Sequence, residues 1–190
     1  MFKHTAMERQ LILQQEKLAQ AVISLTRGTE LEGILRHVGE LSMELTGARY
    51  AMISYVADEG RHYIPLGMGE EELARLDGHW PEGKGLLGLM WEQHEVVRIA
   101  DITTHPRAAG FPPGHAVMHT FLGAPILFEE EIEGVIYLTE KAGGHAFTPI
   151  DETIVRTLAS ACAVAISNAR HIARLEQRNR ELEALIAAGR

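Results

Sequence analysis

His115 and His119 are the two side chains whose type and spacing come closest to a metal site. Four residues apart, they would share one face of a helix, an arrangement that suits zinc. Pro112, Pro113 and Gly114 stand directly before them and oppose a helix start, and no third ligand is obvious. The sequence therefore argues against zinc, and a single loop histidine more often packs or caps a turn than binds a ligand.

The loop that contains His115 extends from Asp101 to Met118. It has little regular periodicity and concentrates three prolines, two glycines and two histidines. Long ordered loops in compact domains usually serve a function, because binding residues are commonly carried by loops on a rigid scaffold. We therefore expect this loop to line a binding site.

The clearest hairpin of the sequence follows this loop, with strands predicted at Thr120–Phe128 and Ile132–Glu140. If the acidic turn between them centres on Glu130, Tyr137 falls opposite Gly123. A large phenol that faces a position without a side chain leaves open space on one sheet face, where a pocket can form. Two alternatives stay open: a register shifted by one residue, and a Tyr137 that is only a core aromatic with its hydroxyl satisfied.

Enzymatic chemistry lacks its usual motifs in this chain. The sequence contains no GxSxG and no P-loop, the motifs of nucleophilic and phosphoryl-transfer chemistry. Cys162, the single cysteine, cannot form an internal disulfide, has no CxxC neighbour for zinc, and is predicted to be a small buried residue. We therefore expect a protein that binds or signals and is not an enzyme.

Composition and charge limit the classes of partner that this chain is expected to bind. A chain of 190 residues with 46% hydrophobic composition can bury the core of one domain. The formal net charge is −8 with acids and bases interspersed, so no basic patch favours nucleic acid or an anionic membrane. The apolar stretch Leu158–Ile166 is far shorter than a membrane span, and Met1–Arg9 lacks the apolar run of a signal peptide. We expect a cytoplasmic protein whose partner is a small ligand or another protein.

The remaining pattern predicts helices around a small sheet. Apolar residues recur at helical spacing from Met7 to Leu45 with a break near 27–30, so we expect two helices, the second closed by Gly47. Further strands are predicted at Tyr50–Val56, Tyr63–Leu66 and Val96–Ile99, and short helices at Glu70–Leu76 and Leu86–Gln93. With the hairpin, these elements make an α/β (α+β) domain.

A long helix is predicted to close the chain. Thr148 can cap it and Pro149 suits its first position. Past Ile166 a heptad seam is formed by Ile172, Leu175, Leu182 and Ile186, with Asn179 in an a position. A buried a-position asparagine favours a parallel two-stranded coiled coil. We predict a homodimer through the terminal helices, with a helix that lies on its own domain as the alternative.

Where this helix starts, the sequence resembles the signature of GAF domains. Lys141, Phe147, Asp151 and Glu152 form the pattern K-x5-F-x3-D-E, with Glu140 where that family often has asparagine. A lysine near the two carboxylates of the first helical turn can tie the end of the strand to the start of the helix, which favours a structural role for the motif over ligand binding. The resemblance implies the GAF fold, a central antiparallel sheet with terminal helices on one face and a ligand pocket on the other.

A longer series of motifs is similar to the haem-binding GAF domain of the mycobacterial dormancy oxygen and redox sensor histidine kinases. The similarity runs from about Leu31 to Ala173, and its strongest strings are Gly85–Gly88, Asp101–Pro106, Gly110–His115, Met118–Pro125 and Tyr137–Lys141. In that family the histidine after the G-F-P-P loop is the proximal haem ligand, and a tyrosine in the following strand hydrogen-bonds gas ligands on the distal side. By position, the resemblance assigns these roles to His115 and Tyr137.

The residue types suit haem b. Haem iron needs a neutral imidazole, a large apolar slot and a distal environment that tunes its sixth position. Around His115, the slot could be lined by Phe111, Pro112, Pro113, Met118, Phe121 and Leu122. The Tyr137 hydroxyl could donate a hydrogen bond to dioxygen. One departure from the family is that Ala51–Val56 supplies neither the acidic residue nor the histidine that the first core strand usually brings to the pocket.

These expectations combine into one hypothesis. The chain is predicted to be a haem-based sensor of a diatomic gas (oxygen, nitric oxide or carbon monoxide) or of redox state, signalling through its terminal helices to a histidine kinase in cis or in trans. We divide it into a signalling helix (1–28), a GAF sensory domain (29–170) and a coiled-coil helix (171–190). A haem-free GAF domain that dimerises or binds another small molecule stays open as the alternative.

Overall fold

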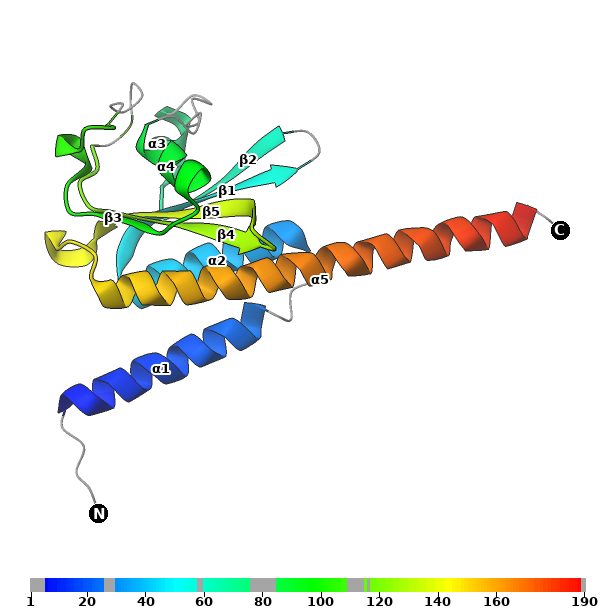
Figure 1. Ribbon diagram of the computed structural model, residues 1–190, viewed down its shortest axis with the longest axis horizontal. Coiled ribbons are helices and arrows are strands. Elements are labelled where there is room, and N and C mark those ends of the chain that lie inside the picture. The colour runs from blue at the N-terminus through cyan, green and yellow to red at the C-terminus, as the bar shows by residue number, and fades with distance from the viewer. Residues whose placement is uncertain are drawn as a thin grey trace, which may run out of the picture.

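Five antiparallel strands form a single sheet in the order β2-β1-β5-β4-β3 (Figure 1). The computed structural model describes residues 6–25, 30–57, 60–75, 85–108, 115 and 117–188, without side chains at 6–12, 14 and 57. The elements are α1 (Ala6–Leu25), α2 (Leu31–Thr46), β1 (Ala48–Ala57), β2 (Gly60–Leu66), α3 (Glu70–Arg75), α4 (Leu86–Gln93), β3 (Val97–Ile99), β4 (Phe121–Phe128), β5 (Glu131–Lys141) and α5 (Pro149–Ala188). The predicted α/β (α+β) class and the predicted elements are confirmed.

The two long helices α2 and α5 cover one face of the sheet, and α1 lies against them on the outside (Figure 1). The main core lies between the sheet and these helices, because α2 buries Ile34, Leu35 and Val38 on one side and α5 buries Leu158. Gly47 ends α2 as predicted, with φ of 72° and its N–H bonded to the Met43 carbonyl at 2.8 Å.

The β4–β5 hairpin has the predicted register, with Tyr137 opposite Gly123. The turn residues are Glu129 and Glu130, both in the left-handed region with φ of 49° and 73°. A two-residue turn alone would shift the pairing by one position. The register shift between Ile126 and Leu127 compensates for this, so Tyr137 still meets the glycine.

The GAF-type motif ties β5 to the start of α5. Lys141 Nζ lies 2.5 Å from the Asp151 carboxylate and 2.9 Å from the Thr46 carbonyl, and Asp151 also accepts hydrogen bonds from the Thr148 N–H and hydroxyl. The prediction that Lys141 ties the end of the strand to the start of the helix is confirmed through Asp151. Glu152 lies one residue further round the helix. Its carboxylate is paired instead with Arg98 and Arg156.

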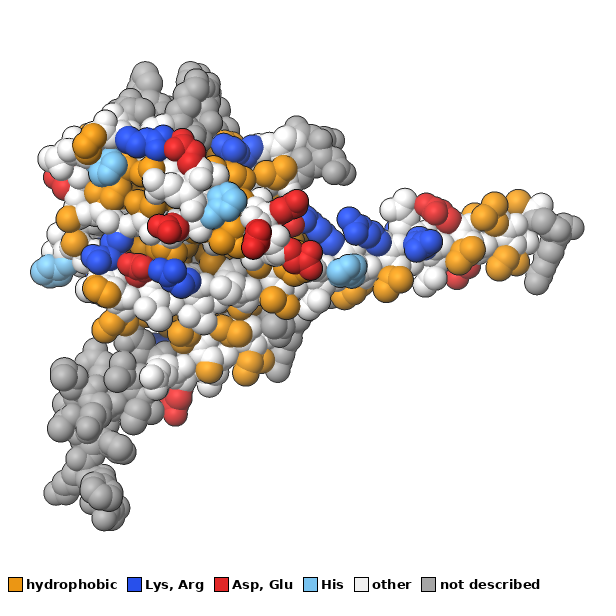
Figure 2. Space-filling model, in the orientation of Figure 1, with side chains coloured by type: hydrophobic (Ala, Val, Ile, Leu, Met, Phe, Trp, Pro, Cys, Tyr) orange, Lys and Arg blue, Asp and Glu red, His pale blue; other side chains and the backbone are white. Residues whose placement is uncertain are grey.

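Helix α5 continues well beyond the sheet (Figure 1). Its last buried side chain is Ala169, and every described side chain from His171 onward is exposed. Large apolar side chains mark this extension (Figure 2) and include Ile172, Leu175, Leu182, Leu185 and Ile186. None of the helices in the described part of the chain is long and apolar enough to cross a membrane.

Candidate functional site

The sheet face opposite α2 and α5 carries the candidate site, and we call it the pocket face. Directly paired residues of antiparallel strands share a face, so one row crosses all five strands there: Pro65, Met52, Tyr137, Gly123 and Val97. Helix α4 packs over β4 and β5 on this side. A second, smaller apolar cluster fills the space between them and includes Leu86, Leu89, Met90, Met118, Phe121 and Tyr137.

Tyr137 is the central side chain of the pocket face. It is 4% exposed, and its hydroxyl accepts a hydrogen bond from Trp91 Nε1 at 3.0 Å and donates one to the Leu87 carbonyl at 3.2 Å. Burial raises the pKa of the phenol, and contacts with Ser54 and Trp91 oppose that rise. Tyr137 is therefore a neutral hydroxyl group that both donates a hydrogen bond to α4 and accepts one from it.

The space predicted above Gly123 is filled. A Cβ atom at position 123 would lie 2.8 Å from the Met90 sulfur and 3.0 Å from the Phe121 ring. The glycine thus allows α4 to approach the sheet closely, with the flexible thioether of Met90 in the place of the missing side chain. The expectation of open space opposite Tyr137 is wrong for this arrangement, because α4 supplies the side chain that occupies it.

Trp91 connects α4 to the central strand β5 and to the edge strand β2. Its indole N–H reaches Tyr137 on β5, and the Arg61 guanidinium of β2 lies 4.2 Å from the centre of its ring. A cation over an aromatic face at this distance is attractive. The contact holds the outer side of the indole while its N–H faces inward.

Ser54 of β1 is the unexpected polar residue of the pocket face. It pairs with Val135 on one side and Tyr63 on the other, and its side chain has 0% exposure. Its Oγ makes no hydrogen bond with any described residue. The hydroxyl is near enough to Tyr137 to influence the pKa of the phenol, but the contact lacks hydrogen-bond geometry.

Of the predicted haem-slot residues that the structure describes, two lie beside Tyr137 and one lies on the opposite face of the sheet. Met118 and Phe121 belong to the apolar cluster of the pocket face, with the Phe121 and Tyr137 rings 6.3 Å apart. Leu122 is buried in the main core on the opposite face, where it contributes to the packing beneath the helices. Because neighbouring residues of a strand point to opposite faces, Phe121 and Leu122 cannot line the same slot, and the assignment of Leu122 is corrected.

The loop residues of the candidate site are only partly described. His115 is half-buried, whereas Phe111, Pro112 and Pro113 lie outside the described residues. His119 is exposed, and its Nδ1 lies 3.5 Å from the Asp101 carboxylate. Within the described part of the chain, no group of three or more His, Cys, Asp or Glu side chains could hold a metal ion. A haem iron needs only one such ligand from the protein.

Sequence reasoning missed Met90 and Trp91 as residues of the site, and it noted Ser54 only as part of the strand that departs from the resembled family. The helix and the strand that carry these residues were predicted. Helix α4 is apolar on several sides, however, so its hydrophobic periodicity did not indicate which side faces the sheet. For Ser54 a signal existed, since a serine in the strand Ala48–Ala57 lies one strand away from Tyr137 once the sheet order is known. That order depends on long-range pairing, which the sequence alone does not specify.

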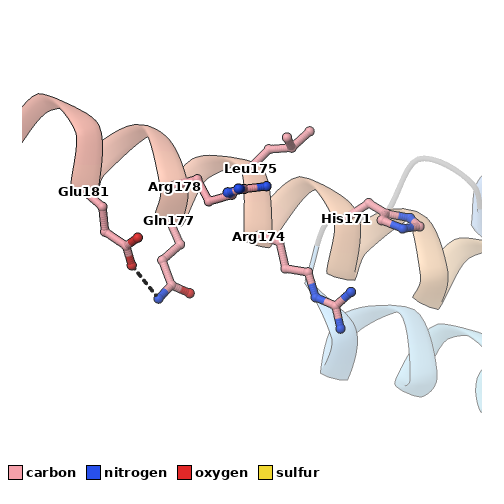
Figure 3. Close-up of a pocket in the computed structure, with 6 residues that line it drawn as sticks. All are labelled: His171, Arg174, Leu175, Gln177, Arg178 and Glu181. Carbon is pink, nitrogen blue, oxygen red and sulfur yellow. Dashed lines mark hydrogen bonds between the residues drawn. The ribbon is translucent and has the colours of Figure 1, made fainter.

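A shallow depression of the described surface lies elsewhere, on the extension of α5 (Figure 3). It is lined by His171, Arg174, Leu175, Gln177, Arg178 and Glu181, with a hydrogen bond of 3.0 Å from Gln177 to Glu181. All six residues are exposed and belong to one helix. A depression between neighbouring side chains of a single helix cannot enclose a small molecule. We regard it as part of a helix surface and not as a ligand site.

Comparison with known proteins agrees with the fold. The sequence matches the family model of the GAF domain over residues 28–167. The GAF domain of a phosphoenolpyruvate-protein phosphotransferase from Coxiella burnetii is similar at a TM-score of 0.69 and 26% identity, covering 85% of this chain and 96% of that one. The GAF domain of the Acinetobacter phosphoenolpyruvate-protein phosphotransferase is similar at a TM-score of 0.68 and 21% identity, covering 84% of this chain and 96% of that one.

An enzyme is also among the similar structures. The free methionine-R-sulfoxide reductase from Neisseria meningitidis has a TM-score of 0.64 and 17% identity, and the match covers 90% of this chain and 97% of the reductase. At this identity the likeness concerns the fold alone. The matched residues, the five-stranded antiparallel sheet and the helices packed on its face together show that this chain belongs to the GAF domain family.

Proposed function

We propose that this chain is a sensor module that binds haem b on its pocket face and passes the state of that site to α5. The observation that carries the proposal is the concentration of apolar side chains around one buried hydroxyl, Tyr137, on the sheet face next to the loop of His115. The rest of the chain supplies a rigid sheet and a long helix, the parts that a signalling module needs.

The described residues fit haem in their chemistry. Met118 and Phe121 offer an apolar wall, His115 offers one half-buried imidazole, and Tyr137 offers a hydroxyl inside the cluster. The buried Ser54 hydroxyl, for which the described residues supply no partner of good hydrogen-bond geometry, adds a second polar group to this face. Met90 and Trp91 occupy this region, so we expect α4 to move outward when a ligand enters.

In this proposal, His115 would hold the iron and the apolar side chains would exclude water. Bound haem would supply an iron atom that takes diatomic gases or changes oxidation state. Tyr137 would provide a neutral donor to the gas, because burial keeps the pKa of its phenol above its usual value. To donate, Tyr137 would release the Leu87 carbonyl, which the helix can satisfy through its own backbone.

We further propose that the signal leaves through α5 as a change in a homodimer. Arg170 lies 2.5 Å from the Glu133 carboxylate and thereby joins the β4–β5 hairpin to α5 where the buried part of the helix ends. Differential ligand affinity of a few kcal/mol between two helix arrangements is enough to shift their populations. A histidine kinase domain, in cis or in trans, is the output that we expect.

One observation favours a second candidate, a haem-free GAF module. Met90 fills the space opposite Tyr137, and Trp91 caps its hydroxyl, so the pocket face is closed by the protein's own side chains. A module of this kind would dimerise, or bind a smaller molecule than haem, without large movement of α4. The Coxiella burnetii relative is a domain of a phosphotransferase, which is compatible with regulation of an attached enzyme.

The absorption spectrum after haem reconstitution separates the two candidates. We expect stoichiometric haem uptake, with a Soret band that shifts when carbon monoxide is added to the ferrous protein. His115→Ala should lose or severely weaken this spectrum, whereas His119→Ala should keep it, because His119 is exposed beside Asp101. A wild-type protein that stays colourless would leave the haem-free module.

A further inference from the structure

Polar side chains join the last turn of α1 to the middle of α2, far along the chain from the pocket face. Ser24 Oγ lies 2.8 Å from His37 Nε2 on α2 and 2.7 Å from the Ala21 carbonyl within α1. The other ring nitrogen, His37 Nδ1, lies 3.8 Å from the Glu40 carboxylate. We call Ser24, His37 and Glu40 the α1–α2 polar link. Beside it, α1 packs on the domain through the buried side chains of Ala21 and Leu25.

The three contacts of this link need one proton each. A serine hydroxyl has one proton, and a neutral imidazole has one, on only one of its two nitrogens. With a neutral ring, either Ser24 leaves the Ala21 carbonyl to donate to His37, or Nδ1 presents a lone pair to the Glu40 carboxylate. An imidazolium has a proton on both nitrogens, so His37 donates to Ser24 while its charge faces Glu40, and Ser24 stays bonded to Ala21. The link is complete only when His37 is protonated.

The surroundings of His37 leave Glu40 as the carboxylate that answers this proton. The two side chains are 41% and 57% exposed, so solvent protons reach the ring. On α1 the nearest described charged side chains, Glu16 and Lys17, lie about two turns before Ser24. Charged and titratable groups on the other elements packed against α2 have partners of their own: Arg170 of α5 with Glu133, Lys141 of β5 with Asp151, and Arg61 and His62 of β2 with the rings of Trp91 and Tyr55.

We propose that the α1–α2 polar link makes the attachment of α1 to the domain depend on pH, with protonation of His37 strengthening it. Histidine changes its charge between pH 5 and 8, the range in which such a link responds to acidity. Helix α1 packs on both α2 and α5 (Figure 1). Acidity would therefore be a second input to the helical layer, one that requires no ligand on the pocket face.

The test is hydrogen–deuterium exchange of α1 in the full chain at about pH 5.5 and about pH 7.5, on either side of the histidine range. Each rate is divided by the intrinsic rate of an unfolded peptide at the same pH, so that only protection by structure is compared. We expect the protection of α1 in wild type to be about fivefold greater at the lower pH, the size of an exposed ion pair. His37→Gln, which still has a donor for Ser24, should show equal protection at both pH values.

Two further variants keep the test specific. Glu40→Gln removes the charge that faces the ring and should reduce the pH ratio of α1 protection, whereas His145→Gln, an exposed histidine between β5 and α5, should keep the wild-type ratio. Equal protection of wild-type α1 at both pH values would overturn the inference, and so would a His37→Gln protein that keeps the wild-type ratio. Because the protein is measured without haem, the outcome is independent of the haem proposal.

Discussion

Tyr137 keeps its proton because ionisation would place a negative charge inside an apolar cluster. Burial is the largest influence on its pKa and raises it above the usual value near 10, while Ser54 and Trp91 act in the opposite direction. A neutral phenol can both donate and accept a hydrogen bond, and Tyr137 does both with α4. The proton on this side chain is therefore part of what holds α4 closed.

This residue predicts a pH dependence of stability. A phenol whose pKa is higher in the folded state stabilises the fold fully below the pKa of the unfolded chain, and the contribution is lost as the pH rises through the folded value. The difference in unfolding free energy between wild type and Tyr137→Phe should therefore stay constant from pH 7 to 9 and shrink above about pH 10. Urea unfolding across this range measures it, and a difference that grows above pH 10 would contradict the assignment.

Cys162 provides a second residue-level test, which concerns the burial of α5. It is fully buried in α5, and burial raises the pKa of its thiol to about 12. Since the thiolate is the reactive form, the folded protein should leave Ellman's reagent almost unreacted at pH 8 and react with one equivalent once unfolded in guanidinium. Reaction of the folded protein at the rate of a free thiol would show that α5 opens there.

The Lys141–Asp151 pair is a largely buried link between two elements of the fold. Asp151 is 3% exposed and joins the end of β5 to the first turn of α5, and it also satisfies the Thr148 backbone. Removing one partner of a buried ion pair leaves the other uncompensated. We expect Asp151→Ala to lower the unfolding free energy by about 3 kcal/mol.

Glu152→Ala provides the matched control one residue along the same helix. Its carboxylate is more exposed than that of Asp151 and pairs with two partly exposed arginines, Arg98 and Arg156. Exposed pairs contribute little, so the loss should stay under about 1 kcal/mol. Chemical denaturation gives both values, and equal losses for the two variants would contradict the structural role given to Asp151.

At the scale of elements, local patterns predicted the fold well and the site less well. The two-residue period around an acidic turn was enough to place Tyr137 opposite Gly123. The same period assigned Phe121 and Leu122 to one slot, although a strand sends them to opposite faces. The inward side of α4 could not be predicted, since an eight-residue apolar helix has no clear polar face.

The whole molecule is dominated by the length of α5. Its exposed extension has apolar residues in the predicted heptad positions, with Leu175 at 62% and Leu182 at 57% exposure in the single chain. Such a surface is costly unless a partner covers it. The Arg170–Glu133 contact lies where this extension begins, so movement of the hairpin could change how two helices pack.

We predict that the protein is a dimer with twice the mass of the 21.0 kDa chain. Leu182→Glu places a charge in the seam and should give a monomer at micromolar concentration, because a coiled coil tolerates no unpaired carboxylate in a d position. Arg180→Ala, outside the seam, should remain dimeric. Multi-angle light scattering measures the masses, and a monomeric wild type would refute dimerisation through α5.

The measurement that tests the central claim most directly is hydrogen–deuterium exchange of the protein with and without one equivalent of haem. The claim is that the ligand enters between the pocket face and α4, with His115 as the protein ligand. We predict changed exchange in α4 (Leu86–Gln93), in the segment from 115 to 120 and in the pocket-face strands β1 and β5, with the buried part of α5 nearly unchanged. Haem that leaves these segments unchanged, or alters exchange only on the α5 extension, would contradict the account.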